Sequence, residues 1–324
     1  MSNTIQTLHK AKREKNDEFY TQRSDIENEL IYYRPHFKDK TVLCNCDDEQ
    51  SAFWEYFHLL FGVLGLKKLI ATHYDKELPT YKVEYCGGND NDLSCCTITP
   101  LVGNGDFRNQ ECIDLLKEAD IVVTNPPFSL FREYLAQLIE YDKKFLIIGN
   151  QNSIVCKEIF PLFKYDKVWL GASAHKSMEF RIPDNAPIRE NQTEKDGVRY
   201  QSLGNICWYT NLDHNKRHQE LKLYETYDPV KYPKYDNFDA INVDKTDKIP
   251  ENYYDIMGVP ISFIDKYCPD QFEIIWQASG NTRACCPADI LNNQLKYSRS
   301  DKDRGGCGVI NGKRLYTRIF IRRK

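Results

Sequence analysis

The chain of 324 residues lacks a strong excess of charge of either sign, with 44 Lys and Arg, 47 Asp and Glu, and a formal charge of −3. This balance excludes a uniformly basic coat for nucleic acid, so a polyanionic partner needs a local basic groove. Long apolar runs are also missing, because the longest, Leu59 to Leu66, is too short to cross a bilayer. With 41% hydrophobic and 28% charged residues, the composition is that of a globular chain.

An apolar signal core is absent from the N-terminus, where residues 1–15 are polar and basic. We therefore expect a cytoplasmic protein that begins with a basic arm over 1–15. The sequence also lacks repeated CxxC pairs, although it has 12 cysteines. A structural metal site is not expected, and reduced cysteines that pack as small apolar residues fit this chain better.

Short β-branched runs alternate with amphipathic segments in the first half of the chain. We expect strands at 41–44, 66–72, 119–124 and 144–148, and helices at 24–33, 52–61, 111–118 and 130–140. Ser24 is the expected N-cap of the first helix. The alternation predicts a parallel sheet with crossover helices, in which ligands bind beyond the carboxyl ends of the strands. From about residue 184 onwards, we expect a late piece of the sheet and an irregular recognition region.

The most informative segment is Asn125-Pro126-Pro127-Phe128, directly after an apolar strand. The two prolines lack N–H groups and force extended geometry on the residues before them, so carbonyl groups point outward without competing donors. The Asn125 side-chain oxygen and the Pro126 carbonyl can each accept one N–H of a ring-attached amine, while Phe128 stacks on the ring. Such acceptors localise the nitrogen lone pair for attack, and no strong base is required. A proline pair that only terminates the strand is the alternative.

Asn-Pro-Pro-Phe after an apolar strand resembles the catalytic tetrapeptide of amino-methyltransferases that use S-adenosylmethionine. The tetrapeptide also occurs in RNA and protein methyltransferases, so it is less specific than the combination of segments found here. Together these segments resemble the EcoRI-type adenine-specific DNA methyltransferase family, and they extend from residue 16 to residue 324: NDEFYTQRSDIENEL, CNCDDEQSAFWEYF, KLIATHYD, GNGDF, GNICWYTNL, MGVPISFIDKY and NGKRLYTRIFIRRK.

The resemblance implies an α/β fold with two main parts. Residues 16–215 are expected to form a Rossmann-like S-adenosylmethionine-dependent methyltransferase sheet with helices on both faces. Residues 216–324 are expected to form an irregular α+β target-recognition region with a basic C-terminal strand. The boundary is approximate, since the two parts can interweave.

The resemblance also implies where the cofactor S-adenosylmethionine binds. Phe19, Tyr20 and Thr21 match the segment that borders the methionine part of the cofactor. Asp47 follows the first strand, where many such enzymes have a glycine-rich turn. Residues 44–48 contain no glycine, so a side-chain contact from Asp47 or Asp48 is expected, with capping of the next helix as the alternative.

Two further acids complete the expected cofactor site. Asp75 follows the second strand and is the candidate for the ribose hydroxyls, with a solvated loop acid as the alternative. Asp106 is expected to accept the amine of the cofactor's adenine while Phe107 lies along the base. A turn-stabilising role for Asp106 is the alternative.

The implied partner is double-stranded DNA, from which the target adenine must be flipped at a cost of about a few kcal/mol. Trp208 and Tyr209 are candidates for the second wall of the base pocket, with core packing as the alternative. The basic C-terminus is expected to place cations against phosphates along one face of a strand, with a charge-protected edge strand as the alternative. The cations are Lys313, Arg314, Arg318, Arg322, Arg323 and Lys324.

The leading hypothesis is a monomeric DNA adenine N6-methyltransferase that flips its target base. We expect it in a restriction–modification system or as a solitary enzyme of bacterial or phage origin, without a stable complex with a cognate endonuclease and without a membrane partner. The first alternative keeps the chemistry and changes the substrate to structured RNA. The second is a catalytically silent nucleic-acid-binding protein, against which the intact tetrapeptide at 125–128 argues.

Overall fold

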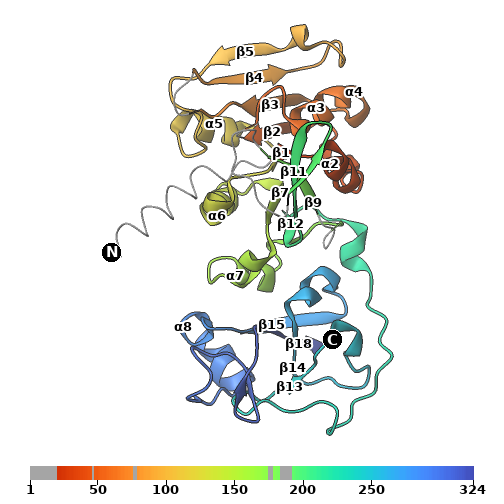
Figure 1. Ribbon diagram of the computed structural model, residues 1–324, viewed down its shortest axis with the longest axis vertical. Helices are drawn as coiled ribbons and strands as arrows, with labels where there is room; N and C mark the ends of the chain where they lie inside the picture. The colour runs from red at the N-terminus through yellow and green to blue at the C-terminus, as the bar shows by residue number, and fades with distance from the viewer. Residues whose placement is uncertain (1–19, 46, 76–78, 174–177, 183–191) are drawn as a thin grey trace. The chain divides into compact units, whose positions relative to one another are not determined.

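The computed structural model describes residues 20–45, 47–75, 79–173, 178–182 and 192–324. The chain divides into two compact units (Figure 1). The first unit holds residues 1–151 and 171–213, and the second holds 152–170 and 214–324. Among the described residues, no helix is both long and apolar enough to cross a membrane.

The main sheet of the first unit runs in the order β5-β4-β3-β2-β6-β7-β12. Its strands are β2 (Thr41–Asn45), β3 (Lys68–Thr72), β4 (Tyr81–Tyr85), β5 (Thr97–Pro100), β6 (Ile121–Thr124), β7 (Lys144–Asn150) and β12 (Ile206–Thr210). The four central strands β3, β2, β6 and β7 are parallel, and the outer pairs are antiparallel. The predicted α/β class with a mostly parallel centre is confirmed.

The α-helices that the structure describes in the first unit are α2 (Arg23–Leu30), α3 (Ala52–Leu59), α4 (Phe61–Leu64), α5 (Gln110–Glu118) and α6 (Phe131–Glu140). Three helical segments connect strands of the main sheet: α3 and α4 between β2 and β3, α5 between β5 and β6, and α6 between β6 and β7, while α2 precedes β2. The expected N-cap Ser24 is wrong, because the helix begins one residue earlier and Gln22 occupies the cap position, although its side chain does not cap the helix. Ser51 does cap α3, since its hydroxyl accepts the Trp54 N–H at 3.1 Å.

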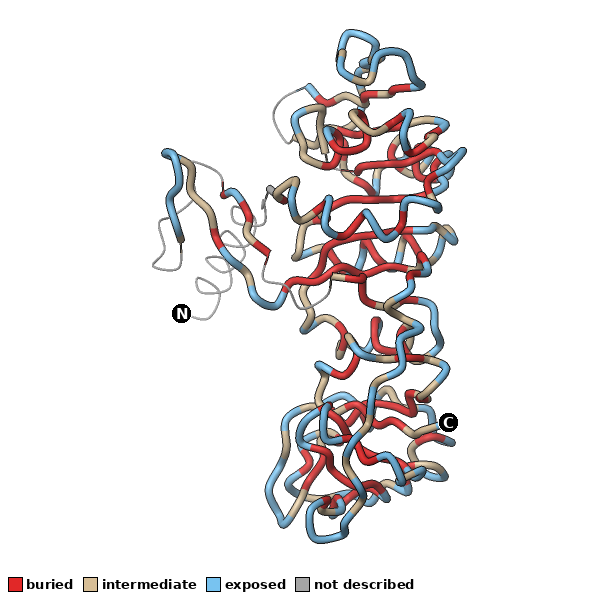
Figure 2. Tube along the Cα trace, turned by 90° about the vertical axis from the view of Figure 1, so that its right-hand side faces the viewer, coloured by how far each residue is buried: buried red, intermediate tan, exposed pale blue. Residues whose placement is uncertain are grey.

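The central strands are buried on both faces, which explains why their sequences are continuous apolar runs. Val42 and Cys44 belong to the core cluster formed with α2 and α3. Leu43, between them, is fully buried outside that cluster, because alternate side chains of a strand point to opposite faces. Figure 2 shows the resulting band of buried residues along the sheet.

A smaller antiparallel sheet, in the order β1-β9-β11-β10, also belongs to the first unit. Its strands are β1 (Tyr20–Thr21), β9 (Met178–Arg181), β10 (Gln192–Lys195) and β11 (Val198–Leu203). The sequence interpretation assigned the polar stretch after residue 184 to an irregular region. Residues 192–203 instead form a hairpin whose tight turn, Asp196-Gly197, has positive φ at both positions.

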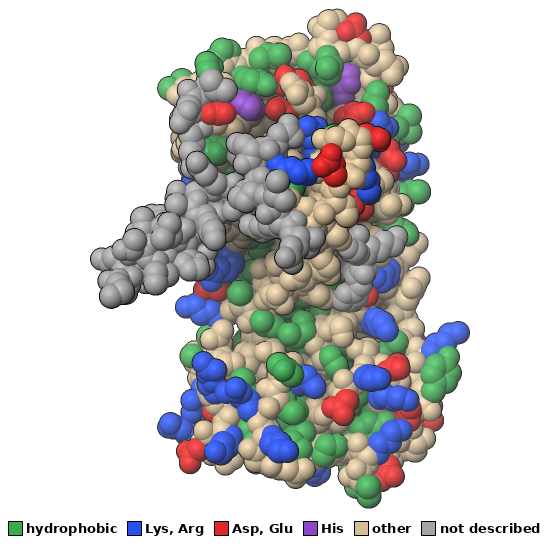
Figure 3. All heavy atoms as spheres, viewed as in Figure 1, with side chains coloured by type: hydrophobic (Ala, Val, Ile, Leu, Met, Phe, Trp, Pro, Cys, Tyr) green, Lys and Arg blue, Asp and Glu red, His purple; other side chains and the backbone are tan. Residues whose placement is uncertain are grey.

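The second unit is built around its own sheet, in the order β13-β14-β18-β15. Its helices and strands are α7 (Phe160–Lys164), β8 (Trp169–Leu170), β13 (Ile241–Asn242), β14 (Met257–Pro260), β15 (Phe272–Ala278), α8 (Thr282–Cys285), β16 (Val309–Ile310), β17 (Lys313–Arg314) and β18 (Arg318–Arg323). The expected late piece of the main sheet is therefore β12, whereas β13, β14, β15 and β18 form a separate sheet. Many Lys and Arg side chains lie on the face of this unit seen in Figure 3.

The basic C-terminal strand β18 occupies the middle of this sheet, between β14 and β15. The alternative of a charge-protected edge strand is therefore wrong. Ile319, Phe320 and Ile321 are fully buried, so the apolar centre of β18 supplies the core of the unit. Lys313 and Arg314 lie outside β18, on the separate β16–β17 hairpin.

Candidate functional site

The tetrapeptide lies where the sequence predicted, immediately after the buried strand β6. Thr124 is the last residue of β6, and Phe128 begins the short helix η3 (Phe128–Leu130) that leads into α6. Pro126 is buried, whereas Asn125, Pro127 and Phe128 are half-buried at the carboxyl edge of the sheet. The Pro127 carbonyl accepts the Leu130 N–H at 2.9 Å, so this carbonyl is used by the turn.

Thr124 connects the start of the tetrapeptide to the neighbouring strand β2. Its buried hydroxyl donates to the Asn45 carbonyl at 2.6 Å and lies 2.8 Å from Asp47 Oδ2. The Asn45 side chain accepts the Thr72 hydroxyl at 3.0 Å, which brings β3 into the same network. The ends of three parallel strands are thereby fixed together next to Asn125.

The carboxyl group of Asp47 is in an unusual environment at the end of β2. Burial raises the pKa of Asp47 to about 7, against the opposing effect of hydrogen bonds from Thr124 and Ser51. The expected position of Asp47 after the first strand is correct. Its role as a cofactor contact stays a prediction.

A second chain segment reaches the tetrapeptide from the small sheet. The Phe128 ring meets the Phe180 ring edge-to-face, with centroids 6.4 Å apart. Phe180 on β9 pairs with Thr21 on β1, and Tyr20 pairs with Arg181. The structure thus brings the segment at 20–21 close to the tetrapeptide. Phe19 lies outside the described residues.

The other predicted acids follow neighbouring strand ends. Asp48 lies 3.5 Å from the His73 ring after β3, and the Asp75 N–H donates to the Asn104 carbonyl at 3.3 Å. Gly105 has a φ of 75°, and a Cβ there would lie 2.2 Å from the His73 carbonyl. Only glycine fits this close approach, so the loops that follow β3 and β5 pack directly on each other.

Asp106 has a strong local partner that the sequence interpretation did not include. Both of its carboxylate oxygens accept from the Arg108 guanidinium, at 2.6 and 2.8 Å. These hydrogen bonds are the largest influence on the pKa of Asp106 and hold it below the ordinary value. Oδ1 also accepts the Arg108 backbone N–H at 2.9 Å, so only Oδ2 keeps a second lone pair that could accept an adenine amine.

Three predicted aromatic contacts are core residues in this structure. Phe107 is 2% exposed and packs edge-to-face on Tyr134, at 4.9 Å between centroids. Tyr209 is fully buried, and its hydroxyl donates to the Asn150 carbonyl at 2.8 Å. Trp208 is 2% exposed and packs against Phe53. The burial of Trp208 and Tyr209 favours the packing alternative, and Phe107 is buried where a cofactor contact was expected.

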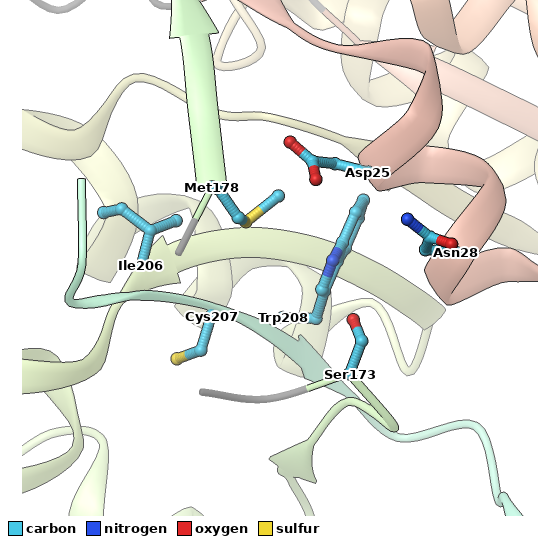
Figure 4. Close-up of a pocket in the computed structure, with 7 residues that line it drawn as sticks. All are labelled: Asp25, Asn28, Ser173, Met178, Ile206, Cys207 and Trp208. Atoms are coloured by element: carbon cyan, nitrogen blue, oxygen red, sulfur yellow. The ribbon is translucent and has the colours of Figure 1, made fainter. Parts of the chain in front are cut away.

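Trp208 also lines a small pocket of the first unit, shown in Figure 4. The other lining residues come from α2, β9, β12 and the segment before β9: Asp25, Asn28, Ser173, Met178, Ile206 and Cys207. None of the tetrapeptide residues lines this pocket. The pocket is therefore distinct from the strand end at which the amine is expected to bind.

Glu29 is a further residue at this side of the unit that sequence reasoning missed. Its fully buried carboxylate accepts the Tyr33 hydroxyl and the N–H groups of Ala172 and Ser173, each at 2.7 Å. The Ser173 hydroxyl is also bonded to it. The signal was present, because Glu29 lies on the apolar face that Ile26 and Tyr33 define.

The cations of the C-terminus fall into two groups. Arg318 donates to Asn242 at 3.3 Å, and Arg322 pairs with Glu273 at 2.7 Å. The Arg323 guanidinium lies 4.8 Å from the centre of the Tyr254 ring, and Lys324 donates to the Pro269 carbonyl. Lys313 and Arg314 are exposed on the hairpin. The single basic face expected from the sequence is thus divided between two elements.

Comparisons with known proteins agree on one family. The family model described as "Adenine-specific methyltransferase EcoRI" matches residues 7–324. The chain is 46% identical to the Type II methyltransferase M.EcoRI of Escherichia coli, over 99% of this chain and 97% of that protein. It is 39% identical to the Type II methyltransferase M.MpnI of Mycoplasma pneumoniae, over 98% of each chain. No solved structure matches the chain significantly.

Proposed function

Because the chain belongs to the family of EcoRI-type adenine-specific methyltransferases, we propose that it methylates the N6 amine of adenine in duplex DNA, with S-adenosylmethionine as methyl donor. Its relatives are named Type II methyltransferases, and we place the chain in a restriction–modification system on that basis. The observation that carries the proposed mechanism is the tetrapeptide at the carboxyl edge of a parallel sheet, tied through Thr124 to the end of β2.

The residues around β1 and β2 fit a polar cofactor. The Asn45 side-chain amide and the Thr21 hydroxyl are buried, yet neither Asn45 Nδ2 nor Thr21 Oγ1 has a hydrogen-bond partner among the residues that the structure describes. Buried polar atoms without partners are rare, and a bound ligand would satisfy them. We assign the cofactor to these two residues together with Tyr20, Asp47 and the loops that hold Asp75 and Asp106. Bound S-adenosylmethionine supplies a methyl group made electrophilic by its sulfonium.

The protein's own contribution is to hold the amine. In the proposed complex, Asn125 Oδ1 and the Pro126 carbonyl each accept one N–H of the flipped adenine, and Phe128 packs on the base. These acceptors bind a pyramidal amine more strongly than a planar one, so they stabilise the transition state selectively. The N6 lone pair is thereby directed at the methyl carbon, and the surplus proton leaves to solvent after transfer.

The decisive experiment compares wild type with Asn125→Ala. Transfer of tritiated methyl groups to duplex DNA should fall below detection in the variant, while calorimetric titration with S-adenosylmethionine stays unchanged. Full activity in the variant would remove the mechanism. Total RNA serves as a second substrate, and labelling of RNA alone would overturn the choice of DNA. A wild type that binds no cofactor would support the silent nucleic-acid-binding alternative.

A further inference from the structure

The second unit carries a paired loop over residues 298–314, which we call the double loop. It consists of the loop 298–307 and the β16–β17 hairpin. Asn237, 1% exposed, closes its base: its carbonyl accepts the Ser298 N–H at 3.1 Å, and its side chain donates to the Cys307 carbonyl and accepts the Val309 N–H, both at 2.9 Å. One buried residue therefore fixes the start of the hairpin and both ends of the loop, through its side chain and its backbone carbonyl.

The tip of the hairpin is fixed as well. Asn311 and Gly312 have φ values of 49° and 70°, as a two-residue turn with the natural strand twist requires. The Asp236 carboxylate accepts the N–H groups of both residues, at 3.1 and 2.8 Å. Consecutive residues 236 and 237 thus hold the tip and the base of the same element.

The loop 298–307 is organised around a buried acid. Asp303 is 1% exposed and accepts the Ser300 and Gly305 N–H groups, at 3.2 and 3.1 Å, and the Tyr297 hydroxyl. The Gly305 carbonyl accepts the Arg283 N–H at 3.0 Å. A Cβ at Gly305 would lie 2.1 Å from the Gly280 carbonyl, so the loop backbone packs directly on the segment before α8. These contacts hold the backbone of the loop from both sides.

The double loop presents cations that form no ion pair within the described part of the chain. Five exposed cations lie in it, against a single exposed acid, Asp301. The cations are Arg299, Lys302, Arg304, Lys313 and Arg314. None of the five makes an ion pair with another residue of the described chain, in contrast to Arg318 and Arg322. In Figure 3, Lys and Arg side chains gather over the part of this unit that holds α8.

We propose that the double loop is the surface by which this protein holds duplex DNA. Unpaired cations suit phosphates because they release counterions from the DNA on contact. The backbone that carries them is already fixed, so it loses little conformational freedom when the DNA binds. Tyr316, two residues after Arg314, is 90% exposed and adds an aromatic ring to the same surface. The inference rests on the proposed function for its choice of DNA. It replaces the expected basic face along β18, whose arginines already have partners.

The test is the salt dependence of DNA binding. The variants are Arg299→Ala/Lys302→Ala/Arg304→Ala and Lys313→Ala/Arg314→Ala. At low salt, each should bind duplex DNA at least about tenfold more weakly, and the slope of log affinity against log salt should fall by about 0.9 for each phosphate that the variant no longer neutralises. An unchanged thermal unfolding transition of the second unit verifies folding. The matched control, Lys222→Ala/Lys245→Ala/Lys266→Ala, removes three exposed cations elsewhere in the unit and should keep the wild-type slope.

A second variant tests the rigidity rather than the charge. Asp236→Ala removes a negative charge, which by electrostatics alone strengthens DNA binding. Loss of the hydrogen bonds from Asn311 and Gly312 to Asp236 should instead weaken DNA binding several-fold, while the salt slope stays at the wild-type value. Stronger DNA binding by this variant would contradict the claim that Asp236 favours binding by fixing the hairpin.

The failure of this inference differs from the failure of the proposed function. If wild type methylates DNA while the charge variants keep its affinity and slope, the double loop is not the DNA surface. If wild type transfers no methyl group to DNA, the proposed function itself is wrong.

Discussion

Replacing Asp47 by an asparagine tests the electrostatics at the end of β2. Burial raises the pKa of Asp47 to about 7, whereas an aspartate in an unfolded chain has a pKa of about 4. At a pH between these two pKa values, Asp47 loses its proton in the unfolded state and keeps it in the folded state. The stabilising contribution of this group is therefore fully present below about pH 4 and is lost as the pH rises to about 7.

The hydrogen-bond geometry supports this interpretation independently. Thr124 Oγ1 lies within bonding distance of two oxygens, the Asn45 carbonyl at 2.6 Å and Asp47 Oδ2 at 2.8 Å. A hydroxyl donates only one proton, and a carbonyl donates none. The hydroxyl therefore cannot donate fully to both oxygens, which limits how far Thr124 offsets the effect of burial on Asp47.

The magnitude follows from the size of the shift. About three pKa units correspond to about 4 kcal/mol, and partial solvent access reduces this to about 2–4 kcal/mol. The introduced amide cannot ionise. The free energy of unfolding of the Asp47→Asn variant, taken relative to that of wild type, should therefore increase as the pH rises from 5 to 8. Urea unfolding of the unliganded protein, followed by hydrogen exchange at amides of β2 and β6, measures the first unit alone. A stability difference that is the same at pH 5 and pH 8 would refute the raised pKa.

Three further substitutions probe separate features. Thr124→Val should lower the free energy of unfolding by about 1–3 kcal/mol and reduce the methylation rate at saturating cofactor, with Thr124→Ser as control; an unchanged rate would contradict its positioning role. Glu29→Gln puts an amide donor against the N–H groups of Ala172 and Ser173 and should cost about 2–4 kcal/mol by thermal or urea unfolding; a neutral result would show that this contact is weak. Tyr316→Ala should weaken DNA binding without changing its salt slope, whereas Tyr316→Phe should bind like wild type.

The central sheet could be predicted because its strands are buried on both faces. Such strands are continuous apolar runs, and β2, β6 and β7 stand out between polar turns for this reason. The C-terminal sheet could not be ordered from its sequence. The pairing of β18 with β14 and β15 joins residues 40 to 64 positions apart, and only packing of the complete unit selects it.

The candidate site was predictable to different degrees. The tetrapeptide could be located because proline acts on its own backbone and its neighbour's, which is a local effect. Phe107 is buried because it packs against Tyr134 of a later helix. The Asp106 carboxylate is already hydrogen-bonded because the Arg108 side chain, two residues later, folds back onto it. Whether a side chain faces a ligand or the core is decided by such partners, which composition and periodicity do not reveal.

The alternation of side chains along an extended strand explains why Thr124 matters for a reaction that it does not touch. Successive side chains point in opposite directions, so when Thr124 faces the end of β2, Asn125 must face away from it. The hydroxyl of one residue therefore fixes the direction of the amide of the next. A shift of about 1 Å in a positioned group is enough to lower a rate about 100-fold. In the proposed complex, the two bonds at Thr124 thus couple the end of β2 assigned to the cofactor to the acceptors assigned to the amine, and loosening them should lower the catalytic rate before it lowers cofactor affinity.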